Sequence, residues 1–174
     1  MSVEKLWAPW RMEYIREIHQ EDHGCIFCEK PKEDNDRENL ILFRGKKNFI
    51  IMNRYPYNNG HLMVVPYEHA SDSFDLKDTV ALEMWKLTNR CKEALTRAFH
   101  PDGFNIGMNI GRTAGAGIDQ HIHMHIVPRW NGDTNYMPVI GETKVISQGL
   151  LEAYDILKPY FTRLRRGSRI PVRG

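Results

Sequence analysis

The sequence contains no long hydrophobic run. No stretch approaches the roughly eighteen consecutive apolar residues that a membrane-spanning helix needs, although 41% of the 174 residues are hydrophobic. The N-terminal segment MSVEKLWAPWRMEYI has charges and tryptophans where a secretory signal has an unbroken apolar region. These absences predict a cytoplasmic protein without a membrane partner.

The sequence also lacks a strong excess of charge. Its 24 Lys and Arg residues and 22 Asp and Glu residues leave a formal net charge of +2, which is too mild to indicate a nucleic-acid-binding surface. The one local bias is the basic segment RLRRGSRIPVRG at residues 163–174, whose composition is typical of a mobile tail. We therefore expect no nucleic-acid partner.

Cysteine is rare, with three residues in the chain. Cys25 and Cys28 form a C-x-x-C pair, which in a reducing compartment indicates metal binding or redox chemistry more than a structural disulfide. The pair alone does not choose between those two roles. Cys91 lies in an apolar periodic segment and is expected to be a small buried hydrophobic residue.

Short strand-like runs occupy residues 40–44, 48–53 and 61–67, with turn-forming residues between them. Three such runs in succession predict an antiparallel meander. A long helix is then expected over about residues 76–100, because its apolar positions largely follow a helical period. The apolar positions in question are Leu76, Val80, Leu82, Trp85, Leu87, Leu95 and Phe99.

Two further strands are expected at residues 104–110 and 122–128, and a second helix over 145–160. No linker or repeat divides the chain, so residues 1–174 are interpreted as one α+β domain. Its centre would be an antiparallel sheet of about five strands with the long helix packed on it. Residues 1–22 would add a helical arm with an aromatic face.

The segment His121-Ile122-His123-Met124-His125 alternates imidazoles with apolar side chains. On a strand this alternation places the three histidines on one face. Such a row is either a fortuitous polar face, part of a metal cluster, or a site where one imidazole attacks and its neighbour donates a proton, since imidazole has a pKa near 6.5. The glycine-rich loop 111–117 that precedes it has backbone N–H groups suited to anionic oxygens, which favours phosphate chemistry.

At these residues the chain resembles the histidine triad proteins. The resemblance extends over most of the chain, through LWAPWRMEYI, NRYPYNNGHLMVVPY, GFNIGMNIG and HIHMHIVPRWNGDTNYM. These segments are similar to the bacterial diadenosine tetraphosphate phosphorylase branch, and more distantly to diadenosine triphosphate hydrolases and galactose-1-phosphate uridylyltransferase.

The resemblance implies roles for individual residues. The middle histidine, His123, would be the nucleophile that forms a nucleotidyl-histidine intermediate, with His125 and His61 orienting and protonating around it. Nucleotide contacts would come from Asn53 at the ribose, from Asn109 near the phosphates and from the backbone of Gly115, Ala116 and Gly117.

One position departs from the family. The hydrolases have Gln, and some phosphorylase-like members Ser, at the position that matches Gly117, where the side chain handles the leaving group or the acceptor. Gln120 or Thr113 are the candidates to replace it. The sequence therefore leaves phosphorolysis and hydrolysis both open.

Several members of the family bind zinc, and the resemblance implies four matching ligands here, Cys25, Cys28, His69 and His121. Two thiolates and two imidazoles make a closed tetrahedral set without an open position for water, which is typical of structural zinc. His23 is a competitor for His69. His19 and His100 are expected at the surface.

Four residues after the triad belong to a segment that similar phosphorylases share, namely Trp130, Asp133, Asn135 and Tyr136. A structural role and a part in substrate or subunit contact are equally compatible with them. Trp7 and Trp85 are expected in the core or an interface, because Trp usually serves burial first.

The predicted function is nucleotidyl transfer from a dinucleoside polyphosphate, through His123, to phosphate or water. The alternatives are hydrolysis of nucleoside phosphoramidates or adenylylated lysine, and a nucleotide-binding sensor with little turnover. The resemblance further implies a homodimer, with the long helix and a strand edge as candidate contacts.

Overall fold

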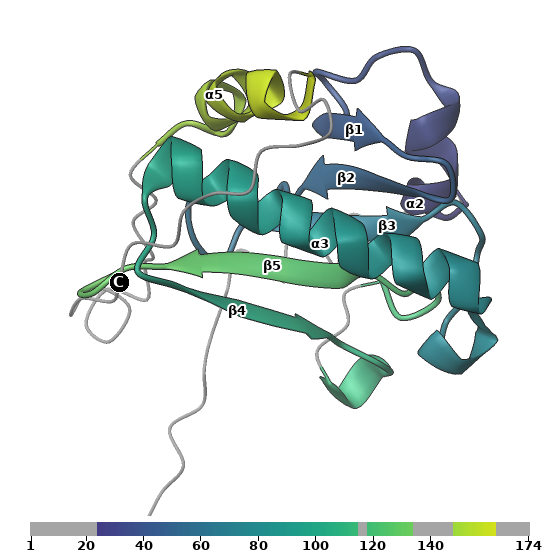
Figure 1. Ribbon diagram of the computed structural model, residues 1–174. Coiled ribbons are helices and arrows are strands. Elements are labelled where there is room, and N and C mark those ends of the chain that lie inside the picture. The colour runs from purple at the N-terminus through teal and green to yellow at the C-terminus, as the bar shows by residue number, and fades with distance from the viewer. Residues whose placement is uncertain (1–23, 115–117, 134–147, 163–174) are drawn as a thin grey trace, which may run out of the picture.

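The computed structural model describes residues 24–114, 118–133 and 148–162 (Figure 1). Its centre is an antiparallel sheet in the order β1-β2-β3-β5-β4. The predicted α+β architecture with about five antiparallel strands is thereby confirmed. The strands are β1 Ile41–Arg44, β2 Asn48–Met52, β3 Leu62–Pro66, β4 Gly103–Met108 and β5 Met124–Arg129.

Two helices, α3 (Asp78–Phe99) and α5 (Leu150–Thr162), cover one face of this sheet (Figure 1). Helix α3 contacts β2, β3 and β5, and α5 contacts β1 and α3. A short helix, α2 (Ile26–Glu29), contains the second cysteine of the C-x-x-C pair. None of the helices in the described ranges is long and apolar enough to cross a bilayer.

Helix α3 confirms the predicted long helix but buries a different face. Each residue advances about 100° around a helix axis, so Leu82 lies about 200° away from the buried Val80. Leu82 and Trp85 are accordingly 55% and 56% exposed, and their assignment to the covering face was wrong. The buried positions follow the helical repeat, and they are Val80, Met84, Leu87, Thr88, Cys91, Ala94 and Leu95.

The strand register decides which residues face away from the helices. Met63 of β3 pairs with both His125 of β5 and Ile51 of β2, and directly paired residues of neighbouring strands point to the same face. Asn48 of β2, three positions before Ile51, donates to the Val80 carbonyl oxygen of α3, so alternation along the strand puts Ile51 on the face away from α3. His125 thus lies on the face that α3 and α5 leave uncovered.

Candidate active site

The three alternating histidines lie at and just before the start of β5. The strand begins at Met124, so His125 is paired within the sheet, whereas His121 and His123 precede it. The prediction that this strand begins at residue 122 was therefore wrong. All three imidazoles are buried, and the His123 and His125 ring centroids are 4.6 Å apart in an edge-to-face arrangement.

A backbone carbonyl fixes the tautomer of His123. Its Nδ1 lies 2.8 Å from the carbonyl oxygen of His121, and because a carbonyl oxygen only accepts hydrogen bonds, Nδ1 must hold the proton. In the neutral ring Nε2 then has an unshared electron pair, which a nucleophile requires. Phe27 packs against this ring with centroids 5.0 Å apart and restricts its rotation.

His61 and His125 form a directed pair behind the nucleophile. The Tyr57 backbone N–H donates to Nδ1 of His61 at 3.1 Å, and the Asn53 side-chain amide lies 3.4 Å from the same nitrogen. Nδ1 of neutral His61 is therefore the acceptor, and its Nε2 holds the proton. That Nε2 lies 3.0 Å from Nδ1 of His125, so it donates there and leaves the His125 proton on Nε2.

A cavity opens beside these rings on the uncovered face of the sheet. His123 and His125 form one part of its wall, and apolar side chains from α2, β2 and β3 form much of the rest. Apolar walls with a few convergent polar groups are typical of small-molecule sites. The lining residues are Ile26, Phe27, Lys30, Ile51, Met52, Asn53, Arg54, Tyr55, Met63, Ile118, His123 and His125.

Two of these lining residues are cations, Lys30 and Arg54, and none is a carboxylate. Burial lowers the pKa of Lys30, and the neighbouring charge of Arg54 lowers it further. Arg54 donates to the Glu38 carbonyl oxygen at 3.3 Å. A cavity with two cations and without a carboxylate attracts an anionic ligand. Neither residue was predicted from the sequence.

The residues predicted to contact the nucleotide have different locations. Asn53 lines the cavity. Asn109, which follows β4, and the exposed Gln120 are not among the described residues that line it. Thr113 is likewise exposed. The three predicted cradle residues, Gly115, Ala116 and Gly117, lie outside the described residues.

The predicted zinc ligands come together into one cluster. The ligand atoms of Cys25, Cys28, His69 and His121 all lie within 4.8 Å of one another. Nδ1 of His121 is 3.2 Å from the Cys25 sulfur and 3.6 Å from the Cys28 sulfur, and Nδ1 of His69 is 3.3 Å from the Cys28 sulfur. Tetrahedral zinc separates such ligands by roughly 3.3–3.8 Å, so this set fits the ion.

The protonation of this cluster also fits a cation. Nε2 of His121 donates to the Pro66 carbonyl oxygen at 2.9 Å, which leaves Nδ1 as the lone-pair nitrogen that faces the sulfurs. Burial lowers the pKa of His121 to about 4, so this ring is neutral at physiological pH. Burial and the nearby Cys25 thiol raise the pKa of Cys28 to about 11, and a bound divalent cation would reverse that by favouring the thiolate.

Other residues singled out from the sequence have separate locations. His100 is exposed and ends α3 in a left-handed conformation with φ 49°. Cys91 is fully buried, as predicted. The Asp133 carboxylate accepts hydrogen bonds from Arg129 and from Asn58. The remaining predictions fall outside the described residues: Trp7, His19, His23, Asn135, Tyr136, the arm 1–22 and the tail 163–174.

Comparison with known proteins places this geometry in a family. Residues 35–132 match the HIT domain. The chain is 36% identical over 168 residues to the AP-4-A phosphorylase of Mycobacterium tuberculosis, covering 93% of this chain and 86% of that protein. It is 31% identical over 108 residues to the adenosine 5'-monophosphoramidase hnt1 of Schizosaccharomyces pombe, covering 62% of this chain and 76% of that protein.

A solved structure agrees with these sequence matches. A Zn-bound histidine triad family protein from Mycobacterium smegmatis superposes with a TM-score of 0.64 at 25% identity, covering 80% of this chain and 94% of that chain. The domain match spans more than half of the chain and includes all three alternating histidines. On these grounds the chain belongs to the HIT domain family, in its AP-4-A phosphorylase-like branch.

Proposed function

We propose that the protein transfers a nucleotidyl group from a dinucleoside polyphosphate, such as diadenosine tetra- or triphosphate, through His123 to phosphate or water. The main support is the hydrogen bond from Nδ1 of His123 to the His121 carbonyl, which leaves Nε2 with its lone pair beside the cavity. The similarity to the mycobacterial AP-4-A phosphorylase agrees with this substrate class.

In the first step Nε2 of His123 attacks a phosphorus atom and forms a phosphorus–nitrogen bond. The bond from that phosphorus to the bridging oxygen breaks, and the remaining nucleotide leaves with the electron pair. The attacking ring retains its proton on Nδ1, where the His121 carbonyl stabilises the positive charge that develops. The product of this step is a nucleotidyl-histidine.

His125 donates a hydrogen bond to the leaving oxygen in that step. Its proton is on Nε2 because Nδ1 accepts from His61, and the ring lies beside His123 at 4.6 Å between centroids. A preorganised donor at developing negative charge contributes typically about 10²- to 10³-fold. In the second step phosphate or water attacks the nucleotidyl-histidine, the phosphorus–nitrogen bond breaks and its electron pair returns to Nε2 of His123, and an attacking water releases its proton to solvent.

The cavity fits the two chemical parts of a nucleotide. Its apolar residues, including Phe27 and Ile51, suit a base, while Lys30 and Arg54 suit the polyphosphate. Asn53, which lines the cavity and contacts His61, would bind a ribose hydroxyl. Gly115, Ala116 and Gly117 would add backbone N–H groups to the phosphates, and Asn109 would hold the nucleotide near the nucleophile.

We assign the cluster of Cys25, Cys28, His69 and His121 to a structural zinc ion. The donor set is complete with four ligands and has no position for a catalytic water. When bound, the ion would cross-link the chain. It would join the segment around Cys25, before α2, to His69 after β3 and to His121, two positions before the nucleophile. These residues would then hold His123 in place. Cys25 and Cys28 are free thiols that could bind a metal, and free thiols persist in a reducing compartment such as the cytoplasm.

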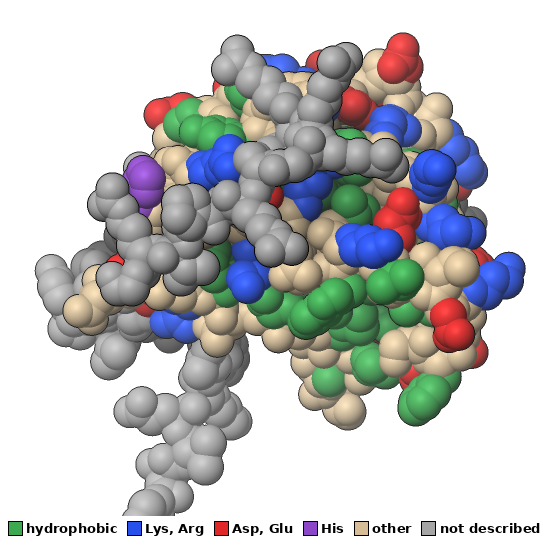
Figure 2. All heavy atoms as spheres, in the orientation of Figure 1, with side chains coloured by type: hydrophobic (Ala, Val, Ile, Leu, Met, Phe, Trp, Pro, Cys, Tyr) green, Lys and Arg blue, Asp and Glu red, His purple; other side chains and the backbone are tan. Residues whose placement is uncertain are grey.

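We further propose that the protein is a homodimer. β4 is an edge strand of the sheet and has exposed residues along it, among them Ile106. Leu82 and Trp85 are exposed on α3, and Figure 2 shows hydrophobic side chains gathered on this face of the molecule. Pairing of two β4 edges with packing of these side chains would bury both features.

Product analysis of the purified protein tests the enzyme assignment. Diadenosine tetraphosphate is incubated with and without inorganic phosphate, and an adenosine phosphoramidate is assayed in parallel. ADP that forms only when phosphate is present identifies a phosphorylase, and AMP formed without phosphate identifies a hydrolase. Turnover of the phosphoramidate alone would contradict the proposal and favour the activity named for the fission yeast relative.

A further inference from the structure

The loop between β2 and β3 connects the catalytic pair to a second, distant network. On its inner side the Tyr57 N–H donates to Nδ1 of His61, and the Tyr57 ring stacks on the His61 ring with centroids 4.9 Å apart. The next residue, Asn58, uses its side chain in other contacts, with the end of β5 and the turn that follows it. The donor N–H belongs to the peptide unit that joins Pro56 to Tyr57, one residue before Asn58, so anchoring Asn58 limits how far that unit can turn.

Asn58 is fixed by the end of β5 and the turn that follows. Its amide donates to the Pro128 carbonyl oxygen at 3.1 Å and to Oδ2 of Asp133 at 2.8 Å. Asp133 is itself held by Arg129, whose Nε and Nη2 donate to its two carboxylate oxygens at 2.6 and 2.9 Å. The Asp133 side chain is only 7% exposed, so it has a defined position from which to orient the amide.

We propose that Asn58 and Asp133 are positioning residues that set the tautomer of His61 and, through it, the nitrogen of His125 that holds the proton. The proposal rests on the function assigned above to His123 and His125. Asp133, which has no part in the proposed reaction steps, would then serve catalysis by holding Asn58.

The physical basis is that the two neutral tautomers of imidazole are close in free energy, so one fixed donor or acceptor selects between them. If the Tyr57 N–H turns away, only the longer contact of 3.4 Å with the Asn53 amide still opposes a proton on Nδ1 of His61. With the proton on Nδ1, Nε2 of His61 becomes an acceptor toward His125. His125 must then donate from Nδ1, and its Nε2 loses the proton with which it donates to the leaving oxygen.

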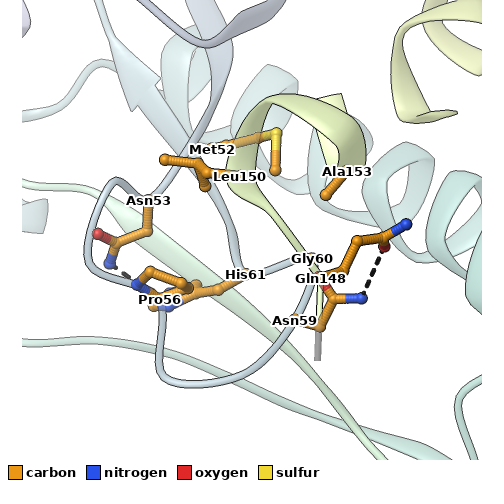
Figure 3. A pocket seen from close by; sticks show the side chains of 9 residues that line it. All are labelled: Met52, Asn53, Pro56, Asn59, Gly60, His61, Gln148, Leu150 and Ala153. Carbon is orange, nitrogen blue, oxygen red and sulfur yellow. Dashed lines mark hydrogen bonds between the residues drawn. The ribbon is translucent and has the colours of Figure 1, made fainter. Parts of the chain in front are cut away.

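Asn59 provides a matched control on the same loop. Its amide also donates a hydrogen bond of 3.1 Å, but to Oε1 of Gln148. Figure 3 shows this contact on the side of the loop that faces α5, beside Leu150 and Ala153. Asn59→Ala therefore removes a side chain of the same type and a bond of the same length without touching the Asp133 network.

The experiment compares Asn58→Ala with Asn59→Ala in the full-length protein by two readouts. The first is the protonation of the His61 ring nitrogens, observed by ¹⁵N NMR of histidine-labelled protein and assigned with His61→Gln. The second is kcat and KM for diadenosine tetraphosphate. We expect Asn58→Ala to populate the Nδ1-protonated form of His61 and to lower kcat about tenfold, which is about 1.4 kcal/mol in the barrier, with little change in KM. Asn59→Ala should do neither.

Two substitutions of Asp133, one conservative and one not, control for misfolding. Asp133→Asn keeps one oxygen to accept from Asn58 and should retain the wild-type tautomer, whereas Asp133→Leu should behave like Asn58→Ala. An unchanged His61 tautomer in both Asn58→Ala and Asp133→Leu would overturn the proposal, as would equal loss of kcat in Asn59→Ala. The NMR readout needs no substrate, so it stands even if the assignment of His123 fails.

Discussion

Two neighbouring histidines, His121 and His123, belong to two different kinds of site. His121 donates from Nε2 to the Pro66 carbonyl and turns Nδ1 toward the cysteine sulfurs. His123 does the reverse, since it donates from Nδ1 to the His121 carbonyl, which leaves the lone pair of the neutral ring on Nε2. The two rings have the same chemistry and similar burial. The position of one backbone carbonyl therefore decides whether a ring is suited to bind a metal or to attack phosphorus.

The loss of His121 and the loss of His123 should therefore have different consequences. Under the proposed function, the cluster of Cys25, Cys28, His69 and His121 would stabilise the chain by binding zinc, while the cluster of His61, His123 and His125 would act on the substrate. Substitutions in the second cluster should therefore change turnover before stability, and those in the first should do the opposite.

The largest effect on turnover is expected for His123→Ala. The substitution removes the nucleophile, so turnover should fall by at least about 10³-fold, roughly 4 kcal/mol in the barrier. Steady-state assays with diadenosine tetraphosphate measure this, and circular dichroism verifies the fold. His100→Asn is the control, because it replaces an exposed histidine whose left-handed conformation Asn tolerates. Turnover of His123→Ala within about tenfold of the wild type would reject the assignment.

A smaller loss, on the order of 10²-fold, is expected for His125→Asn, because the nucleophile remains and only the hydrogen-bond donor to the leaving oxygen is lost. The loss should appear in kcat and not in KM, because the donor acts on charge that develops in the transition state. Steady-state kinetics with diadenosine tetraphosphate separate the two constants. A change confined to KM would remove this role from His125.

Lys30→Met should have a moderate effect that depends on the charge of the substrate. We expect KM for diadenosine tetraphosphate to rise by about threefold to tenfold, and KM for an adenosine phosphoramidate to change less, because in the proposed complex Lys30 would face the polyphosphate. The control is Lys32→Met, which removes an exposed lysine paired with Glu29 at 2.7 Å, outside the cavity. A uniform rise in KM for both substrates would assign Lys30 to the base instead of the phosphates.

The smallest effect on turnover and the largest on stability are expected for Cys28→Ser. We expect roughly one zinc ion per chain in the wild type and loss of most of it in the variant. The melting temperature should fall by about 5 °C or more, since closed metal sites contribute folding free energy. Metal analysis and differential scanning calorimetry measure both.

Cys91→Ala is the matched control for this prediction. It truncates a fully buried cysteine of α3 that is remote from the cluster, so it should lower stability while zinc stays bound. Wild-type protein purified without chelator that contains no zinc would contradict the assignment of the cluster.

Much of this arrangement follows from residue types and spacing. Strand-like runs and a helical period predict the sheet and α3, and alternation at residues 121–125 predicts a histidine row. The prediction that Leu82 and Trp85 belong to the covering face of α3 was wrong, because an apolar residue does not have to be buried. Exposed hydrophobic side chains are common on protein surfaces. The predicted start of β5 was wrong because the alternation of His and apolar residues extends beyond the residues that pair in the sheet.

The contacts that choose a nitrogen on each ring have no signature in the sequence. Tyr57 acts on His61 through its backbone N–H, which every residue except proline has. The carbonyls of Pro66 and His121 act in the same way. Lys30 was missed for a related reason, since a lysine in a polar segment is expected in solvent until the fold brings it to a cavity wall.

Phe27 packs against both His121 and His123, with centroids 5.5 and 5.0 Å away, so one ring from the N-terminal part of the chain completes both sites. The Cys25–His121 contact joins residues 96 positions apart. Contacts of such long range form late in folding, because their loop entropy must first be overcome. During synthesis the cysteines would emerge long before their histidine partner. The nucleophile would therefore gain its final surroundings only after both segments have been synthesised and have come together.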